Sequence, residues 1–169
     1  VASGWTGVHE NTIYTEEAGF GIDPESASRI SRDRGADHSD LDRDWVAGLG
    51  WTFLVDLPNG DYDVTVTMGD LLAGTSTITN NIVLEDEAAG TLSARQEIKS
   101  GTYRTTVADG QLTANFNGPG SVAGLVNSIE IVEADEDDSS DPPDPDPTDP
   151  PDPEYGTIAS PSYLRTAHV

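Results

Sequence analysis

The chain has 169 residues, of which only 35% are hydrophobic, and its formal net charge is −23 at pH 7. Such an acidic surface repels phosphate backbones and anionic lipids, so nucleic acid and membrane partners are not expected. The absence of cysteine excludes disulfides and thiolate metal sites, and no apolar run reaches the roughly 18 residues of a membrane-spanning segment.

The acidic charge extends through the part of the chain that is patterned like a folded domain. Residues 1–133 hold 21 of the 31 acidic residues and seven of the eight basic ones, which gives this part a charge of −14. Aspartate outnumbers glutamate 20 to 11, and Lys99 stands against seven arginines. This balance is typical of proteins that stay hydrated in high salt. We expect a halophilic protein; the alternative is an acidic protein from an ordinary habitat.

Composition divides the chain into three regions. Residues 1–133 show strand patterns, residues 134–153 repeat Asp and Pro with nine acids and no base, and residues 154–169 form a short mixed segment. Because proline fixes φ and like charges repel, the middle region is expected to be an extended, disordered linker at roughly 3 Å per residue. The last segment reads either as the start of a further domain or as a tail.

The clearest strand pattern lies at residues 51–70. Residues 51–57 are followed by Pro-Asn-Gly at 58–60, and residues 61–70 then alternate apolar and polar side chains. An Asn-Gly pair supplies the positive φ of a tight turn. This stretch therefore predicts a half-buried hairpin.

Further short strands are predicted along the rest of the domain, at residues 79–86, 102–109, 111–118 and 125–133. The Asp109-Gly110 pair marks a second hairpin. One helical turn is expected within residues 37–46. Many short antiparallel strands joined by Gly-rich turns predict an all-β fold, namely a β-sandwich of the jelly-roll type.

The sequence offers little from which a catalytic site can be assembled. A serine hydrolase needs a nucleophile on a sharp turn together with a histidine and an acid. No Gly-x-Ser-x-Gly occurs, and of His9, His38 and His168 the last lies beyond the linker. Glycoside cleavage uses a pair of carboxylates, but in a chain with 31 acids some pair falls at a suitable distance by chance, so such a pair does not indicate catalysis. We expect no catalytic residue and no cofactor here.

Asp40, Asp42 and Asp44 alternate as they do in a calcium-binding loop. The sixth and twelfth positions of that loop require Gly and Glu, and here they are Trp45 and Trp51. A helix N-terminus carrying acidic residues explains the pattern better. Calcium binding somewhere in the domain stays an alternative, because oxygen ligands are plentiful.

Three of the seven basic residues of the domain gather in one irregular stretch, at Arg29, Arg32 and Arg34. Guanidinium groups hold carboxylates or sugar hydroxyls bidentately, so an acidic polysaccharide is a sensible ligand. The alternative is that these arginines lock the loop by pairing with neighbouring acids, namely Asp33, Asp37 or Asp44.

Aromatic rings bear strongly on sugar binding, because the flat face of a pyranose stacks on a flat ring. Trp5, Tyr14 and Phe20 lie outside the strand pattern and are candidates for such a platform. Trp45 and Trp51 are expected in the core instead. For each candidate, a place in the core is the alternative.

Five segments of the first region occur in an order and spacing that resemble one family. They are YTEEAGFGI at 14–22, SRDRG at 31–35, FLVDLPNGDYDVTVTMGD at 53–70, VADGQLTANFNG at 107–118 and VNSIEIVE at 126–133. The series resembles the galactose-binding-like β-sandwich domains attached to rhamnogalacturonan acetylesterase-type esterases, rhamnogalacturonan lyases and agarases. The resemblance implies a jelly-roll accessory module without catalysis of its own, in a secreted polysaccharide-degrading protein with its catalytic domain elsewhere in the parent chain.

Two departures from the family pattern affect what the resemblance implies. Such domains begin with a strand of the Phe-Asp-Phe-Gly type, whereas this sequence starts after that position, so a first strand is expected to be missing. The family also lacks a single ligand signature that transfers residue by residue. The site is therefore an inference from the loops at one end of the sandwich, where such domains hold ligands.

The residues expected to line this site are Tyr14, Phe20, Arg32, Arg34, Asp70 and Asn127. Asn80 is a further expected contact. The two arginines and the polar residues are expected to form a cup for the sugar, and one of the two aromatic rings is expected to stack on it.

The first interpretation is a non-catalytic, monomeric carbohydrate-binding module, secreted by a halophilic organism. It is expected to act on pectin-type (rhamnogalacturonan) polysaccharide together with a tethered catalytic domain. One alternative is a structural or interaction spacer without a ligand. Another is a part of an esterase or lyase whose catalytic residues lie outside this chain.

Overall fold

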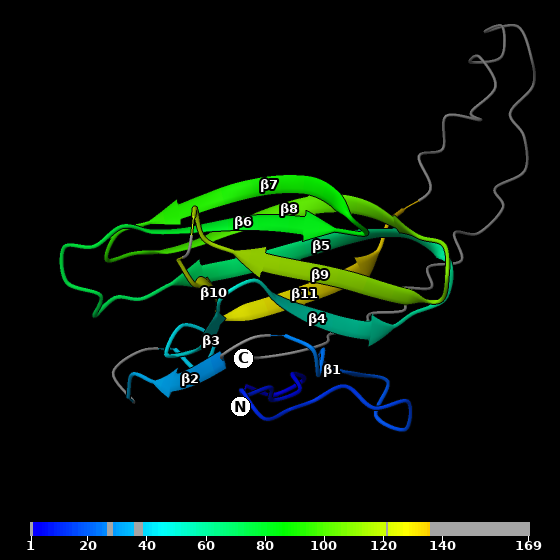
Figure 1. The fold of residues 1–169 in the computed structure, drawn as a ribbon, viewed down its shortest axis with the longest axis horizontal. Helices are drawn as coiled ribbons and strands as arrows, with labels where there is room; N and C mark the ends of the chain where they lie inside the picture. The colour runs from blue at the N-terminus through cyan, green and yellow to red at the C-terminus, as the bar shows by residue number, and fades with distance from the viewer. Residues whose placement is uncertain (1, 27–28, 36–38, 121, 136–169) are drawn as a thin grey trace, which may run out of the picture.

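The computed structural model describes residues 2–26, 29–35, 39–120 and 122–135 (Figure 1). The predicted linker from residue 136 onward and the segment 154–169 lie outside this part. The described residues contain no helix, and hence none that could cross a bilayer. They form eleven strands: β1 (Phe20–Ile22), β2 (Arg29–Asp33), β3 (Asp44–Gly48), β4 (Trp51–Asp56), β5 (Gly60–Gly69), β6 (Ile78–Leu84), β7 (Glu87–Ala94), β8 (Ile98–Val107), β9 (Gln111–Asn117), β10 (Gly124–Val126) and β11 (Ser128–Glu133).

These strands form a sandwich of antiparallel sheets. A five-stranded sheet has the order β1-β4-β9-β6-β7, and a three-stranded sheet has the order β11-β5-β8. A second three-stranded sheet, β10-β3-β2, lies at one end of the sandwich (Figure 1). The all-β sandwich that the strand pattern predicted is therefore present.

The core fills the space between the two larger sheets. Trp51, Phe53 and Phe116 face inward from the five-stranded sheet, and Val64 and Ile131 face them from the other sheet. All five are at most 1% exposed, and the rings of Trp51 and Phe116 lie 4.9 Å apart. Burial of this apolar surface holds the sheets together, because removing it from water is the main favourable term in folding.

The predicted hairpin at residues 51–70 is wrong, although both of its strands exist. β4 pairs with β1 and β9, whereas β5 pairs with β11 and β8, so residues 57–60 carry the chain from one sheet to the other. Neither Asn59 nor Gly60 adopts a positive φ. The Asn59 side chain instead donates a hydrogen bond of 2.8 Å to the Ala108 carbonyl.

The hairpin predicted at Asp109-Gly110 is wrong in the same way. Gly110 has the expected positive φ of 88°, but β8 and β9 belong to different sheets. A true hairpin joins β6 to β7 through Glu85 and Asp86, whose φ angles are 49° and 61°. That turn lacks glycine, which is why the sequence pattern did not reveal it.

Four strands escaped the sequence analysis: β1, β2, β3 and β7. β2 spans Arg29–Asp33, so most of the stretch that was expected to be irregular is a strand paired with β3. The predicted helical turn is a single turn in which the Arg43 amide donates to the Ser39 carbonyl at 3.0 Å, and β3 follows. The predicted strand at 125–133 is divided by Asn127 into β10 and β11.

We expect Leu112→Ala to lower the free energy of unfolding by about 2–5 kcal/mol, because it empties a fully buried position on β9. Leu54→Ala is the matched control, since Leu54 lies on the neighbouring strand β4 and is half-exposed on the outer face of the sheet. The Leu54→Ala substitution should lower the free energy of unfolding by less than about 1 kcal/mol. Urea denaturation in molar salt measures both, and equal losses would contradict the assignment of the two faces.

Candidate functional site

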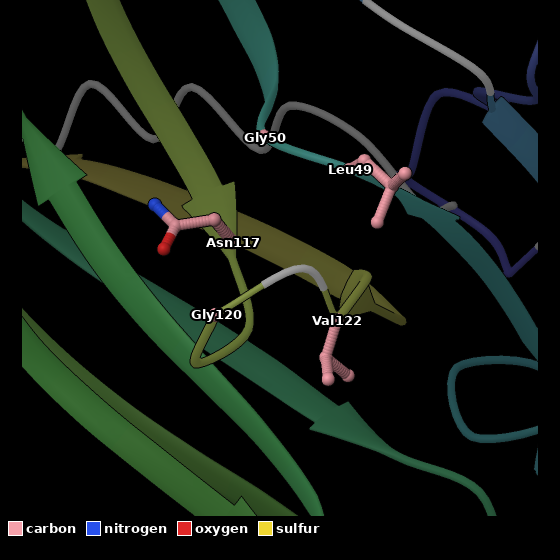
Figure 2. Close-up of a pocket in the computed structure, with 5 residues that line it drawn as sticks. All are labelled: Leu49, Gly50, Asn117, Gly120 and Val122. Atoms are coloured by element: carbon pink, nitrogen blue, oxygen red, sulfur yellow. The ribbon is translucent and has the colours of Figure 1, made fainter.

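An open pocket of about 350 Å³ lies at one end of the sandwich (Figure 2). Leu49 and Gly50 form the turn between β3 and β4, and Asn117 ends β9. Gly120 and Val122 belong to the loop that leads to β10. The five residues come from two segments that are far apart in the sequence, 49–50 and 117–122, and together they line the pocket.

The rim of this pocket is apolar and the two turns that build it depend on glycine. Leu49 is 47% exposed and Val122 is 54% exposed. Gly50 and Gly120 have φ angles of 61° and 68°, which side chains rarely tolerate. The pocket is therefore lined by two exposed apolar side chains and by the polar Asn117, a combination that suits the mixed polar and apolar faces of a small ligand.

Asn117 also belongs to an amide row that crosses four strands. Its Oδ1 accepts from Asn81 Nδ2 at 3.3 Å, and its Nδ2 donates to Asn115 Oδ1 at 3.1 Å. The row continues from Asn115 to Thr52 at 3.0 Å, and Thr91 donates to Asn81 at 3.0 Å. Each amide uses one N–H in the row, so a second N–H and further lone pairs stay available to hydroxyl groups.

Asp70 and Asn127, two of the predicted ligand contacts, lie beneath the surface. Asp70 is 4% exposed; one of its carboxylate oxygens accepts from Arg34, and the other accepts from the Leu72 amide at 2.9 Å. Asn127 is fully buried and donates to the carbonyls of Asp42 and Asp44 at 3.1 and 2.9 Å. The contacts of both side chains fasten loops to the sandwich.

Asn80, the further expected contact, is also fully buried. Its Nδ2 donates to the Leu125 carbonyl at 3.0 Å. This bond ties β6 to β10, so Asn80 shares the structural task of Asn127. Sequence reasoning placed these polar residues near one another but could not tell that they point inward.

Arg32 and Arg34 both lie over the ring of Trp45, with their guanidinium carbons 5.7 and 5.5 Å from its centroid. Trp45 is buried, as predicted, and the contacts are cation–π interactions. Arg34 is ion-paired with Asp70. Arg32 is exposed, and no acid in the described part of the chain forms an ion pair with it.

Arg43, which the sequence analysis did not single out, takes the partners expected for the other arginines. It donates to Asp33 at 2.6 Å and lies 3.6 Å from Asp40 and 3.5 Å from Asp44. Asp37 lies outside the described residues. These bonds from Arg43, with one of 2.7 Å from the Gly35 amide, hold the pKa of Asp33 below its usual range.

Tyr14 and Phe20 lie at the opposite end of the sandwich, so the predicted cup is not one site. Tyr14 Oη donates to the Asp56 carboxylate at 3.0 Å, and Phe20 is paired with Val55. Both therefore sit beside the crossover at 57–60, where β5 begins, whereas Asp70 follows its end. A ten-residue strand separates the two ends by roughly 33 Å.

The acids at residues 40–44 are engaged with neighbouring side chains. Asp42 accepts from Ser39 Oγ at 2.5 Å, while Asp40 and Asp44 face Arg43. No group of three metal-type ligands occurs in the part of the chain that the structure describes. Calcium binding stays a prediction.

Residues 1–118 match the sequence profile of the family described as beta-agarase/YXIM esterase-like, galactose-binding domain-like. The chain belongs to this family. The matched residues include the strands from β1 to β9, and hence both large sheets except β11. The galactose-binding-like β-sandwich that the sequence resembles is thereby confirmed.

Solved structures show the same fold in larger proteins. Protein YxiM from Bacillus subtilis is similar over 79% of this chain, with 26% identity and a TM-score of 0.61. A beta-glucuronidase from Bacteroides uniformis is similar over 68% of the chain, with 14% identity and a TM-score of 0.52. The chain spans 37% of YxiM and 15% of the glucuronidase. No curated protein sequence matches it.

We expect Asp70→Asn to lower the free energy of unfolding by about 2 kcal/mol, because it removes a charged partner from the half-buried Arg34. The control is Asp63→Asn, whose exposed pair with Arg104 is worth less than about 1 kcal/mol. Denaturant unfolding compares the two variants. A folded Asp70→Asn protein of unchanged stability that loses a ligand would contradict the structural role of Asp70.

The lowered pKa of Asp33 predicts an acid-sensitive contribution to stability. In the unfolded chain this carboxyl titrates near its usual value of about 3.9. Above that pH the bonds to Arg43 stabilise the fold fully, and this stabilisation is lost as the pH falls through the lower folded-state pKa. Asp33→Asn should therefore be less stable than the wild type at pH 7, and the difference should shrink below about pH 4. Unfolding midpoints across this range test it; a constant difference would contradict it.

Proposed function

We propose that this chain is a non-catalytic module that binds polysaccharide for an enzyme to which it is tethered. The pocket between Leu49, Asn117 and Val122 carries the proposal, because it joins exposed apolar side chains to an amide with free hydrogen-bonding capacity. Membership in a galactose-binding domain-like family supports the same reading. None of the five lining residues is an acid, a base or a nucleophile, which favours binding over catalysis.

For the ligand, we propose a pectin-type polysaccharide such as rhamnogalacturonan. Arg32 supports this choice, because its exposed guanidinium rests on Trp45 and lies in no ion pair with a described acid. A guanidinium held in this way suits the carboxylate of an acidic sugar. Arg32 is paired with Trp45 in the register of β2 and β3, and three residues lie between Trp45 and the turn at Leu49 and Gly50. One polysaccharide chain can therefore reach both Arg32 and the pocket.

We further propose that the parent protein is a secreted esterase or lyase of a halophilic organism, with its catalytic residues outside this chain. For the first part, the family description supports an esterase, because it names agarases and esterase-like proteins. The charge of −23 and the single lysine support the second.

A structural spacer is the second candidate function. It is favoured by the lining of the pocket, because none of the five residues offers an aromatic ring on which a sugar can stack. A spacer of this kind would hold the catalytic domain at a distance without contacting polysaccharide. Binding measurements separate the two candidates directly.

We expect the full chain to bind rhamnogalacturonan saturably in calorimetry in molar salt, and Asn117→Ala to weaken binding about tenfold through lost hydrogen bonds. Asn59→Ala is the matched control, since Asn59 lies at the opposite end. Arg32→Gln should weaken binding of rhamnogalacturonan more than binding of neutral galactan. Each titration is repeated once with added calcium and once with a chelator. A folded chain that binds none of these polysaccharides would establish the spacer instead.

A further inference from the structure

The outer face of the five-stranded sheet carries an unbroken line of polar side chains along its central strand. β9 alternates buried residues with half-exposed ones over its whole length. The half-exposed residues are Gln111, Thr113, Asn115 and Asn117. At about 3.4 Å per residue, this line extends roughly 20 Å from the crossover end of the sandwich to the pocket, which is longer than one sugar ring.

An aromatic ring and a carboxylate lie at the crossover end of the line. Gln111 Nε2 donates to Asp56 Oδ1 at 2.8 Å, and Tyr14 Oη donates to the same carboxylate at 3.0 and 3.1 Å. The hydrogen bond to Asp56 raises the pKa of Tyr14, because the carboxylate stabilises the protonated phenol. Tyr14, which does not reach the pocket, thus belongs to the same sheet face as the amide row.

The middle of the line is flanked by apolar side chains. Leu54 on β4 lies opposite Thr113, and Val83 on β6 lies opposite Asn115, each half-exposed on the same face. Directly opposed residues of an antiparallel pair share a face, so apolar and polar groups alternate across the strands. This pattern matches a sugar chain, which presents C–H surfaces and hydroxyls in turn.

The charge of this face determines whether an acidic or a neutral polysaccharide binds there. Asp56 borders it at one end, and Glu85 accepts a hydrogen bond of 2.7 Å from the Thr113 amide. None of the side chains named on this face is basic. A polyanion is therefore repelled, whereas neutral hydroxyls find amide and hydroxyl groups that both donate and accept.

We propose that this face, which we call the β9 track, binds an internal stretch of a neutral polysaccharide from Tyr14 and Asp56 to the pocket at Asn117. The inference rests on the proposed carbohydrate-binding function and deepens it. Arg32 is on a different sheet, β10-β3-β2, so acidic and neutral sugars of a branched polysaccharide contact different surfaces. An extended track binds the interior of a chain and needs no chain end.

The test is calorimetry of the full chain in molar salt with neutral oligosaccharides of one, three and six units, in a β-1,4-galactan series and an agarose series. Affinity should rise at least tenfold from one to six units in one series. Thr113→Trp blocks the middle of the track and should lower hexasaccharide affinity at least tenfold. Thr65→Trp is the matched control, because Thr65 also faces solvent from the central strand of the other large sheet.

The outcomes separate this inference from the proposed function. If the chain binds rhamnogalacturonan but its affinity does not rise along either neutral series, the proposal of the β9 track is wrong and the proposed polysaccharide-binding function stands. The same holds if Thr113→Trp and Thr65→Trp bind the hexasaccharide equally. No binding of any glycan overturns both. If Thr113→Trp does not fold, the double variant Gln111→Ala, Asn81→Ala replaces it with the same expected loss.

Discussion

Two adjacent crossovers align the halves of this sandwich. The Leu57 amide donates to the Gly110 carbonyl at 3.0 Å, and the Asn59 side chain donates to the Ala108 carbonyl. Because β4 pairs with β9 in one sheet and β5 pairs with β8 in the other, the chain passes between the sheets twice at the same place. These bonds fix the two registers relative to each other. They thereby decide which side chains meet in the core and which side chains line each outer face.

Alternation of apolar and polar residues predicted the strands because burial is a local property of a pleated strand. It could not predict which strands pair, since two strands joined by a short turn have the same sequence pattern whether they pair with each other or belong to different sheets. Asn59 and Gly60 show this, because an Asn-Gly pair that is typical of hairpins here forms a crossover. β7 was missed for another reason. Its sequence, EAAGTLSA, has little strand preference and becomes a strand through its pairing with β6.

The candidate site was partly within reach of sequence reasoning. Arg34 and Asp70 were expected to lie together and do so, although 36 residues separate them. Their burial was not foreseen, because loop position says nothing about side-chain direction. Asn117 and Asn81 were missed. A signal was present, since alternation along residues 111–117 places three amide side chains on the polar side of one strand, but the sequence analysis predicted only a strand there and assigned no function to that side.

The strict alternation along β9 separates two kinds of evolutionary constraint. Leu112, Ala114 and Phe116 are fixed by the core that they share with the opposite sheet. The residues between them are half-exposed on the outer face, so they can change without repacking the core. Descendants of such a domain can therefore diverge in ligand preference by exchanging every second residue of one strand. In related sequences, conserved and variable positions are therefore expected to alternate along this strand.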